Sequence, residues 1–334
     1  MTKFFQSSFF AQELFKNIPG TLSFKDSWYS LVFYWVFFIF IFISSFLIYL
    51  YRVPIRLNYK RSKKIIGMSK KTFWMLVGWI IMFFIILRSI MIIFIEKYGV
   101  IDYKIDDLDG TVKSKLWEII PLHFCRIMLL FISISLIINK IKFVKFYAYL
   151  AVWAAIVAVA IPGIYRHSGF DNWWYWDYLF AHGFIILFTV LLWNVSGVRF
   201  SFKDTLYTFA VSLAIGLVMF AINYASYKIA FAKFPNDPNE RLKYISNYWY
   251  LGLDDYNEFA WIFGPLSKWP IHIVTWTILG YTLIILSIII SSFMSKFKVV
   301  RTKEGNFKLI SVKSKYWKFY KASFRLKKVS KTNN

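Results

Sequence analysis

Long hydrophobic runs divide the chain, with polar and mostly basic segments between them. Each run holds about 18–25 mainly apolar residues, the length that an α-helix needs to cross a hydrocarbon core of about 30 Å. An all-α polytopic membrane protein, folded as a bundle of seven transmembrane helices, is therefore predicted. The seven predicted spans are 28–50, 72–95, 119–138, 146–163, 178–195, 205–228 and 269–293.

The fourth run is short and rich in small residues, among them Ala151, Ala155 and Ala158. Small residues let helix backbones approach closely, so this helix is expected in the middle of the bundle. The third and seventh runs open alike, on Pro121 and Pro270, each followed two residues later by a histidine. This likeness suggests a 3+1+3 arrangement of two parallel repeats, although proline at a helix start also has purely local causes.

Lysine and arginine set the predicted orientation. One alternating set of loops, together with the tail, holds 26 of them, the other set holds 12, and three lie inside spans. The richer side is expected to be cytoplasmic. The amino terminus is then outside, which gives an extracytoplasmic segment 1–27, a transmembrane domain 28–293 and a basic cytoplasmic tail 294–334 of a multi-pass protein of the cell membrane.

Charge and composition narrow the function classes. The 334-residue chain is 58% hydrophobic and carries a net charge of +24. In a soluble protein such a charge would suggest nucleic acid, but here it lies in loops and tail, so no nucleic-acid partner is expected. The tail is predicted either to bind anionic lipid headgroups or to act only as a positive-inside anchor. The sequence contains no His-Glu-x-x-His motif and no nucleotide-binding glycine loop, so neither a metal nor a cofactor is predicted.

Polar residues inside the predicted spans are the candidate functional residues, because ionisable side chains are costly in a bilayer and tend to mark function. All of them fall in the outer halves of the spans, as expected if several helices line one outward-facing cavity. Each also has a structural interpretation, such as snorkelling to the headgroups, capping a helix, interhelical hydrogen bonding or packing as a small hydrophobe. The set is Arg88, His123, Cys125, Arg126, His182, Asn223, Lys228 and His272.

Spacing limits how Cys125, the only cysteine of the chain, could react. Cys125 and His123 are two residues apart, so on a straight helix their side chains point in roughly opposite directions. A base for a Cys125 nucleophile must then come from another helix. His182 is predicted at the right depth, between Ala181 and Gly183, whose small size indicates tight packing against a neighbouring helix.

Several short motifs, in order, resemble the YwaF-type family of bacterial integral membrane proteins. They are Ile120-Pro121-Leu122-His123-Phe124-Cys125, Ala181-His182-Gly183, Asn223-Tyr224 with Pro235, and Gly264-Pro265 with Trp269-Pro270. The chain departs from the pattern in a longer segment 236–262 and in Ser267 and Lys268, which separate the last two pairs. Eukaryotic relatives of that family are similar to membrane acyltransferases acting on ether phospholipids. The resemblance implies that Cys125 carries an acyl group and that His182 is its base.

The leading hypothesis is a lipid acyltransferase whose site lies in the outer half of the bilayer, with Cys125 and His182 catalytic and a membrane phospholipid or acyl donor as substrate. Arg88, Arg126 or Lys228 would hold a phosphate, and His123, Asn223 and His272 would line the pocket. A small-solute transporter is the second hypothesis, favoured by the repeat. A receptor or assembly factor without catalysis is the third.

Overall fold

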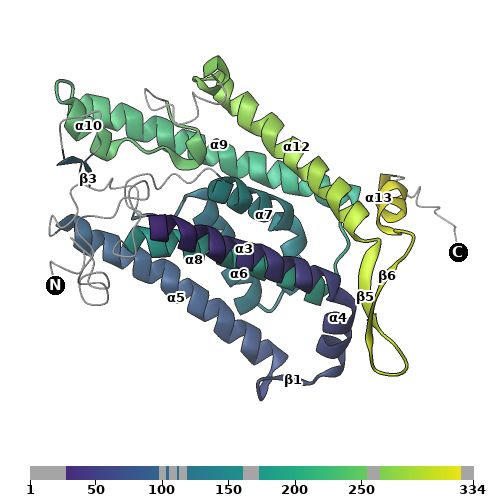
Figure 1. The fold of residues 1–334 in the computed structure, drawn as a ribbon. Coiled ribbons are helices and arrows are strands. Elements are labelled where there is room, and N and C mark those ends of the chain that lie inside the picture. The colour runs from purple at the N-terminus through teal and green to yellow at the C-terminus, as the bar shows by residue number, and fades with distance from the viewer. Residues whose placement is uncertain are drawn as a thin grey trace, which may run out of the picture.

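Helices make up most of the computed structural model, which describes residues 28–97, 103–104, 111–112, 119–160, 173–253 and 264–324 (Figure 1). The seven main apolar helices are α3 (Trp28–Leu50), α5 (Lys70–Lys97), α6 (Phe124–Ile137), α7 (Val144–Ala160), α8 (Trp173–Ser196), α9 (Phe202–Lys233) and α12 (Ile271–Met294).

Short elements connect these helices or follow them. Three antiparallel pairs, β1 with β2, β3 with β4 and β5 with β6, are local hairpins. The bounds are α4 (Arg52–Arg61), β1 (Lys64–Ile65), β2 (Met68–Ser69), β3 (Tyr103–Lys104), β4 (Thr111–Val112), η2 (Ile141–Phe143), α10 (Pro238–Tyr244), η3 (Tyr248–Tyr250), η4 (Gly264–Ser267), β5 (Phe297–Arg301), β6 (Phe307–Ser311) and α13 (Tyr316–Phe324).

Within the described ranges, six helices are long and apolar enough to cross a membrane, and the exception among the seven apolar helices is α6, with 14 residues. The predicted third span, 119–138, is therefore helical only from Phe124. Pro121 has no backbone N–H, and His123 takes a non-helical backbone conformation as the N-cap. At about 1.5 Å per residue, α6 alone is shorter than a hydrocarbon core. The fourth span was predicted to end at 163, and 161–163 lie outside the described residues.

Hydrogen bonds between the ends of different helices define two ends of the bundle. At one end the start of α3 meets α8 and α7: the Tyr175 hydroxyl donates to the Ser30 carbonyl, and the Tyr34 hydroxyl donates to the Val159 carbonyl. At the other, Arg52 after α3 donates to the carbonyl of Ser295 after α12. We call the first the histidine end, because it holds His123, His182 and His272, and the second the basic end.

Successive apolar helices, α6 included, run in alternating directions between these two ends. Trp249, after α9, donates to the carbonyl of Leu122 before α6 at the histidine end. Lys145 on α7 pairs with Asp204 on α9 at the basic end. This alternation agrees with seven passes, and the protein is a polytopic all-α membrane protein.

The core lies among α3, α5, α6, α7 and α8, with α9 and α12 along one side (Figure 1). Helix α7 packs against α6, α8, α9 and α12, with Ala151 and Ala155 buried. The predicted central place of the fourth span is confirmed. Gly78 on α5 allows a close approach to α6, where a Cβ would lie 2.9 Å from the Ser133 carbonyl oxygen.

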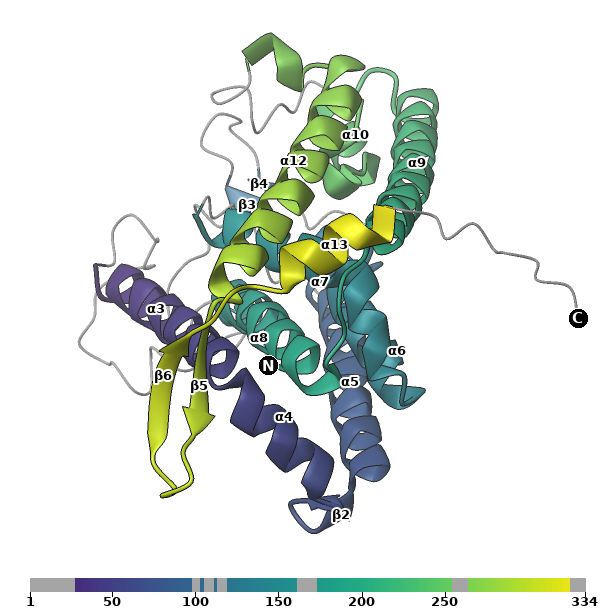
Figure 2. The same ribbon diagram turned by 90° about the vertical axis from the view of Figure 1, so that its right-hand side faces the viewer.

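The tail after α12 folds back onto the basic end. Strands β5 and β6, each of five residues, form a hairpin, and α13 lies across the ends of α9 and α12 (Figure 2). Tyr320 on α13 is buried against Phe200, Ile284 and Ile288. The sequence predicted only a basic tail here, so this local structure is a finding.

Candidate functional site

Two arginines on different helices share one carboxylate at the histidine end. Arg88 Nε on α5 donates to Asp177 Oδ2 on α8 at 3.1 Å, and Arg126 Nη2 on α6 donates to the same oxygen. Arg88 is 4% exposed and Arg126 7%. Snorkelling to the headgroups is therefore not their role. Each charge is buried and paired, the arrangement that makes an ionised group tolerable in a low-dielectric interior.

The cluster joins α5, α6 and α8 through one shared carboxylate oxygen. Asp177 lies in the first turns of α8, one residue before the span predicted from 178. Sequence reasoning missed it for that reason, although an acidic residue between an aromatic run and an apolar helix is the signal that identifies it.

His182 lies one turn further along α8 and is 4% exposed. Its Nδ1 is 2.8 Å from the Tyr178 carbonyl oxygen. A carbonyl only accepts hydrogen bonds, so Nδ1 carries the hydrogen, and Nε2 of the neutral ring keeps its lone pair. Arg126 and Asp177 lie within electrostatic range of the ring. The charge cluster and His182 thus belong to one region.

Cys125 is the second residue of α6, half-buried, and packs against the main core cluster. Ala181 and Ile185, on either side of His182, are buried members of that cluster, and α6 packs against α8. The two predicted catalytic residues therefore lie on neighbouring helices at the same end of the bundle. Their catalytic roles remain predictions.

A loop between α9 and α12 covers the start of α6. Trp249 Nε1 donates to the Leu122 carbonyl at 3.1 Å, and the Trp249 ring packs on Phe124 at 4.7 Å between centroids. The Tyr248 ring packs edge-on against His123 at 5.2 Å. The predicted pocket residue His123 is thus the N-cap of α6, beneath this loop.

Asn223 holds that loop in place. Its Nδ2 donates to the Tyr248 carbonyl, and its Oδ1 accepts from the Tyr248 amide and the Ser246 hydroxyl, at 2.8–2.9 Å. Trp249 adopts a φ of 58°, a left-handed conformation that persists in a bulky residue only where its surroundings enforce it. The side chain of Asn223 is 0% exposed. Among the described residues its role is therefore structural: it anchors the loop to α9.

The remaining two predicted residues lie elsewhere on the helices. Lys228 is exposed on α9, with its ammonium 5.6 Å from the Tyr224 ring centroid, whereas Asn223 and Ser226 occupy the buried face of that helix. His272 is 3% exposed in the first turn of α12. The structure thus brings Arg88, Arg126 and His182 together and leaves Lys228 apart from them.

Within the described ranges, no group of three or more His, Cys, Asp or Glu residues is arranged to hold a metal ion.

Compared with known protein families, the chain matches the model of the TMEM164 family over residues 22–289. The chain belongs to the TMEM164 family. No curated protein and no solved structure matches it. The TMEM164 match covers the charge cluster, Cys125, His182 and the Asn223 loop anchor, and it stops within α12. The β5–β6 hairpin and α13, which pack at the basic end, lie beyond the matched region.

Proposed function

We propose that this multi-pass protein of the TMEM164 family is a membrane acyltransferase, with Cys125 as nucleophile and His182 as base. The observation that carries the proposal is the hydrogen bond from His182 Nδ1 to the Tyr178 carbonyl. It fixes the tautomer whose Nε2 accepts a proton, in a helix packed against the one that bears the thiol. The resemblance of the Cys125 motif to the YwaF-type family supports acyl transfer.

The proposed reaction has two balanced steps. In the first, the Cys125 thiol gives its proton to His182 Nε2, and sulfur attacks the ester carbonyl of the donor lipid. The carbon–oxygen ester bond breaks, and the leaving alcohol takes the proton back from His182, which leaves a thioester on Cys125. In the second, a hydroxyl of the acceptor lipid gives its proton to His182 and attacks the thioester, and the sulfur leaves and regains that proton.

Two neighbouring features suit the charges of such a reaction. Cys125 lies in the first turn of α6. The amides of Arg126 and Ile127 donate to the His123 carbonyl, so the first-turn amides placed to stabilise a developing oxyanion are those of Phe124 and Cys125. Arg88 and Arg126 place two cations at this end of the bundle, and cations favour a phosphate group nearby. In this proposal the arginines hold the substrate electrostatically, while Asp177 holds the arginines.

The basic end suits an enzyme better than a transporter, because hydrogen bonds tie its helix ends to the tail. Arg52 joins α3 to the carbonyls of Ser295 and Phe297, and the Ser323 hydroxyl after α12 accepts from the Phe202 amide. A site reached from one end suits a reaction within one leaflet. The basic tail is also proposed to contact anionic lipid headgroups at this end.

The test uses the fact that Cys125 is the only cysteine. Purified full-length protein is incubated with phospholipid carrying an alkyne-labelled acyl chain, and the protein is probed for label that hydroxylamine removes. Wild type should carry a hydroxylamine-sensitive label, and Cys125→Ser should not form it. His182→Gln should form it at least tenfold more slowly, as expected for loss of a general base.

Lipid mass spectrometry of cells expressing the same variants, matched for abundance, gives the second readout. An acyl-composition change with wild type, lost in both variants, supports acyl transfer. Lys228→Gln serves as a matched control, because Lys228 is exposed and lies apart from the cluster, so it should retain the wild-type change. Correctly inserted wild type that yields neither thioester nor lipid change would contradict the proposal.

A further inference from the structure

Three arginines gather at the basic end, far from the proposed catalytic region. Arg52 and Arg56 are one turn apart on α4, and Arg199 lies in the turn between α8 and α9. Arg56 Nε donates to the Asn194 carbonyl at 2.9 Å, which ties α4 to the last turn of α8. Gly197 permits this approach, since a Cβ there would lie 3.2 Å from Arg56 Nε.

These three cations have no acidic partner among the described residues, where the carboxylates in ion pairs are Asp177 and Asp204. The pKa of Arg56 is lowered, mainly by burial and further by the positive charges of Arg52 and Arg199. Like charges held close together in a half-buried position repel one another, and an anion placed between them relieves that repulsion.

The donors that remain suit a phosphate. Arg52 donates from Nη1 and Nη2 to the carbonyls of Tyr49, Phe297 and Ser295. Within the described ranges Arg56 donates only from Nε, which leaves its two Nη groups for a bidentate partner. Arg199 is exposed, with its guanidinium 5.5 Å from the Phe319 ring centroid. The buried side-chain amide of Asn194 has no hydrogen-bond partner within the described ranges and adds a polar group beside Arg56.

We propose that Arg56 and Arg199, with the positive charge of Arg52 beside them, bind the phosphate of an anionic phospholipid headgroup in the leaflet at the basic end. A lipid source suits the location, because α4 follows directly on the membrane-spanning α3 and the cluster lies where that helix leaves the hydrocarbon. The site is independent of acyl transfer, since it lies at the opposite end from Cys125, and Cys125→Ala should leave it intact.

Native mass spectrometry of the full-length protein tests the site, with phosphatidylglycerol and phosphatidylcholine as probes. Wild type should retain phosphatidylglycerol preferentially. The double variant Arg56→Gln/Arg199→Gln should lose about tenfold in that preference, the size expected for charge-assisted phosphate contacts. Arg199→Gln alone, at an exposed position that does not threaten folding, should lose about threefold.

Arg61→Gln is the matched control, because Arg61 is exposed on the same helix and its substitution removes the same charge. It should retain the wild-type preference. Equal losses in Arg61→Gln and in the double variant would overturn the site in favour of general surface charge, as would no loss in the double variant. Inorganic phosphate is the third probe: displacement of phosphatidylglycerol by an equal concentration of it would overturn the lipid assignment.

Discussion

At the histidine end, Arg88 and Arg126 are neutralised in part by the side chain of Asp177, whereas at the basic end Arg52 and Arg56 donate to backbone carbonyls. The first arrangement depends on the side chain of Asp177, which is 11% exposed. The arrangement at the basic end lies at the margin of the membrane. Its acceptors are backbone carbonyls at the ends of α8 and α12, which no side-chain substitution removes. Charge at the histidine end is therefore the more vulnerable to substitution.

The largest expected effect comes from removing that carboxylate. Asp177→Asn leaves two buried guanidinium groups without their shared counter-charge, and breaking a buried ion pair in this way costs about 3–5 kcal/mol of unfolding free energy. Denaturant titration of purified protein in mild detergent measures the loss. Glu304→Gln, at an exposed position in the turn between β5 and β6, is the control and should change stability by less than about 0.5 kcal/mol.

Loss of less than about 1 kcal/mol in Asp177→Asn would mean that the arginines find other partners, and the cluster would no longer explain the difference between the ends.

The second comparison concerns the loop over α6. Asn223→Ala removes three hydrogen bonds and leaves the buried amide and carbonyl of Tyr248 without these partners. We expect a loss of about 2–4 kcal/mol, because unsatisfied buried polar groups cost about 1–3 kcal/mol each. The same titration measures it, together with the rate of proteolysis in the loop. Asn58→Ala, exposed on α4, should be nearly neutral, and equal losses would argue against the anchor.

Sequence reasoning recovered the apolar helices because lipid forces every spanning segment into a long apolar run. It missed Asp177 because hydropathy places a span boundary only to within a few residues, and this boundary excluded the one acid that both arginines need. It also missed β5, β6 and α13, since short elements carry little periodicity. In the sequence these elements are indicated by Gly305, which adopts a left-handed φ of 91° in the turn of the hairpin, and by the aromatic residues of α13.

Between the two ends, helix packing offers a third test. Gly78→Ala places a methyl group 2.9 Å from backbone atoms of Ser133 and Ile137 on α6, which forces α5 and α6 apart at a cost of about 1–3 kcal/mol. Gly280→Ala is the matched substitution on α12, where nothing lies within 4 Å. It should be neutral or stabilising by up to about 1 kcal/mol, since alanine is the better helix former. Similar changes in both would mean that α5 and α6 are not closely packed.

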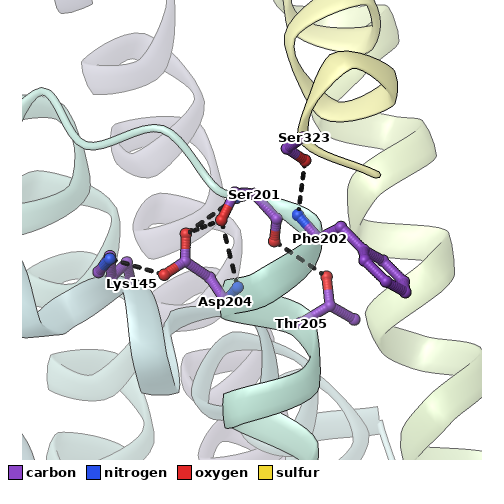
Figure 3. A network of polar contacts seen from close by, with 6 residues as sticks. All are labelled: Lys145, Ser201, Phe202, Asp204, Thr205 and Ser323. Carbon is purple, nitrogen blue, oxygen red and sulfur yellow. Dashed lines mark hydrogen bonds and ion pairs between the residues drawn. The ribbon is translucent and has the colours of Figure 1, made fainter. Parts of the chain in front are cut away.

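The smallest expected effect is at the basic end, where α9 begins with a capping box (Figure 3). The Ser201 hydroxyl accepts from the Asp204 amide, the Asp204 carboxylate accepts from the Ser201 amide, and its other oxygen pairs with Lys145. Ser201→Ala removes one partner of the first-turn amides and should cost about 1 kcal/mol. Ser196→Ala, five residues earlier, where the hydroxyl only donates to the Trp193 carbonyl, should cost less. If Ser201→Ala lowered the free energy of unfolding as much as Asp177→Asn, the two ends would be equally vulnerable to substitution. The Lys145–Asp204 ion pair would then be unable to hold the start of α9 without the Ser201 cap.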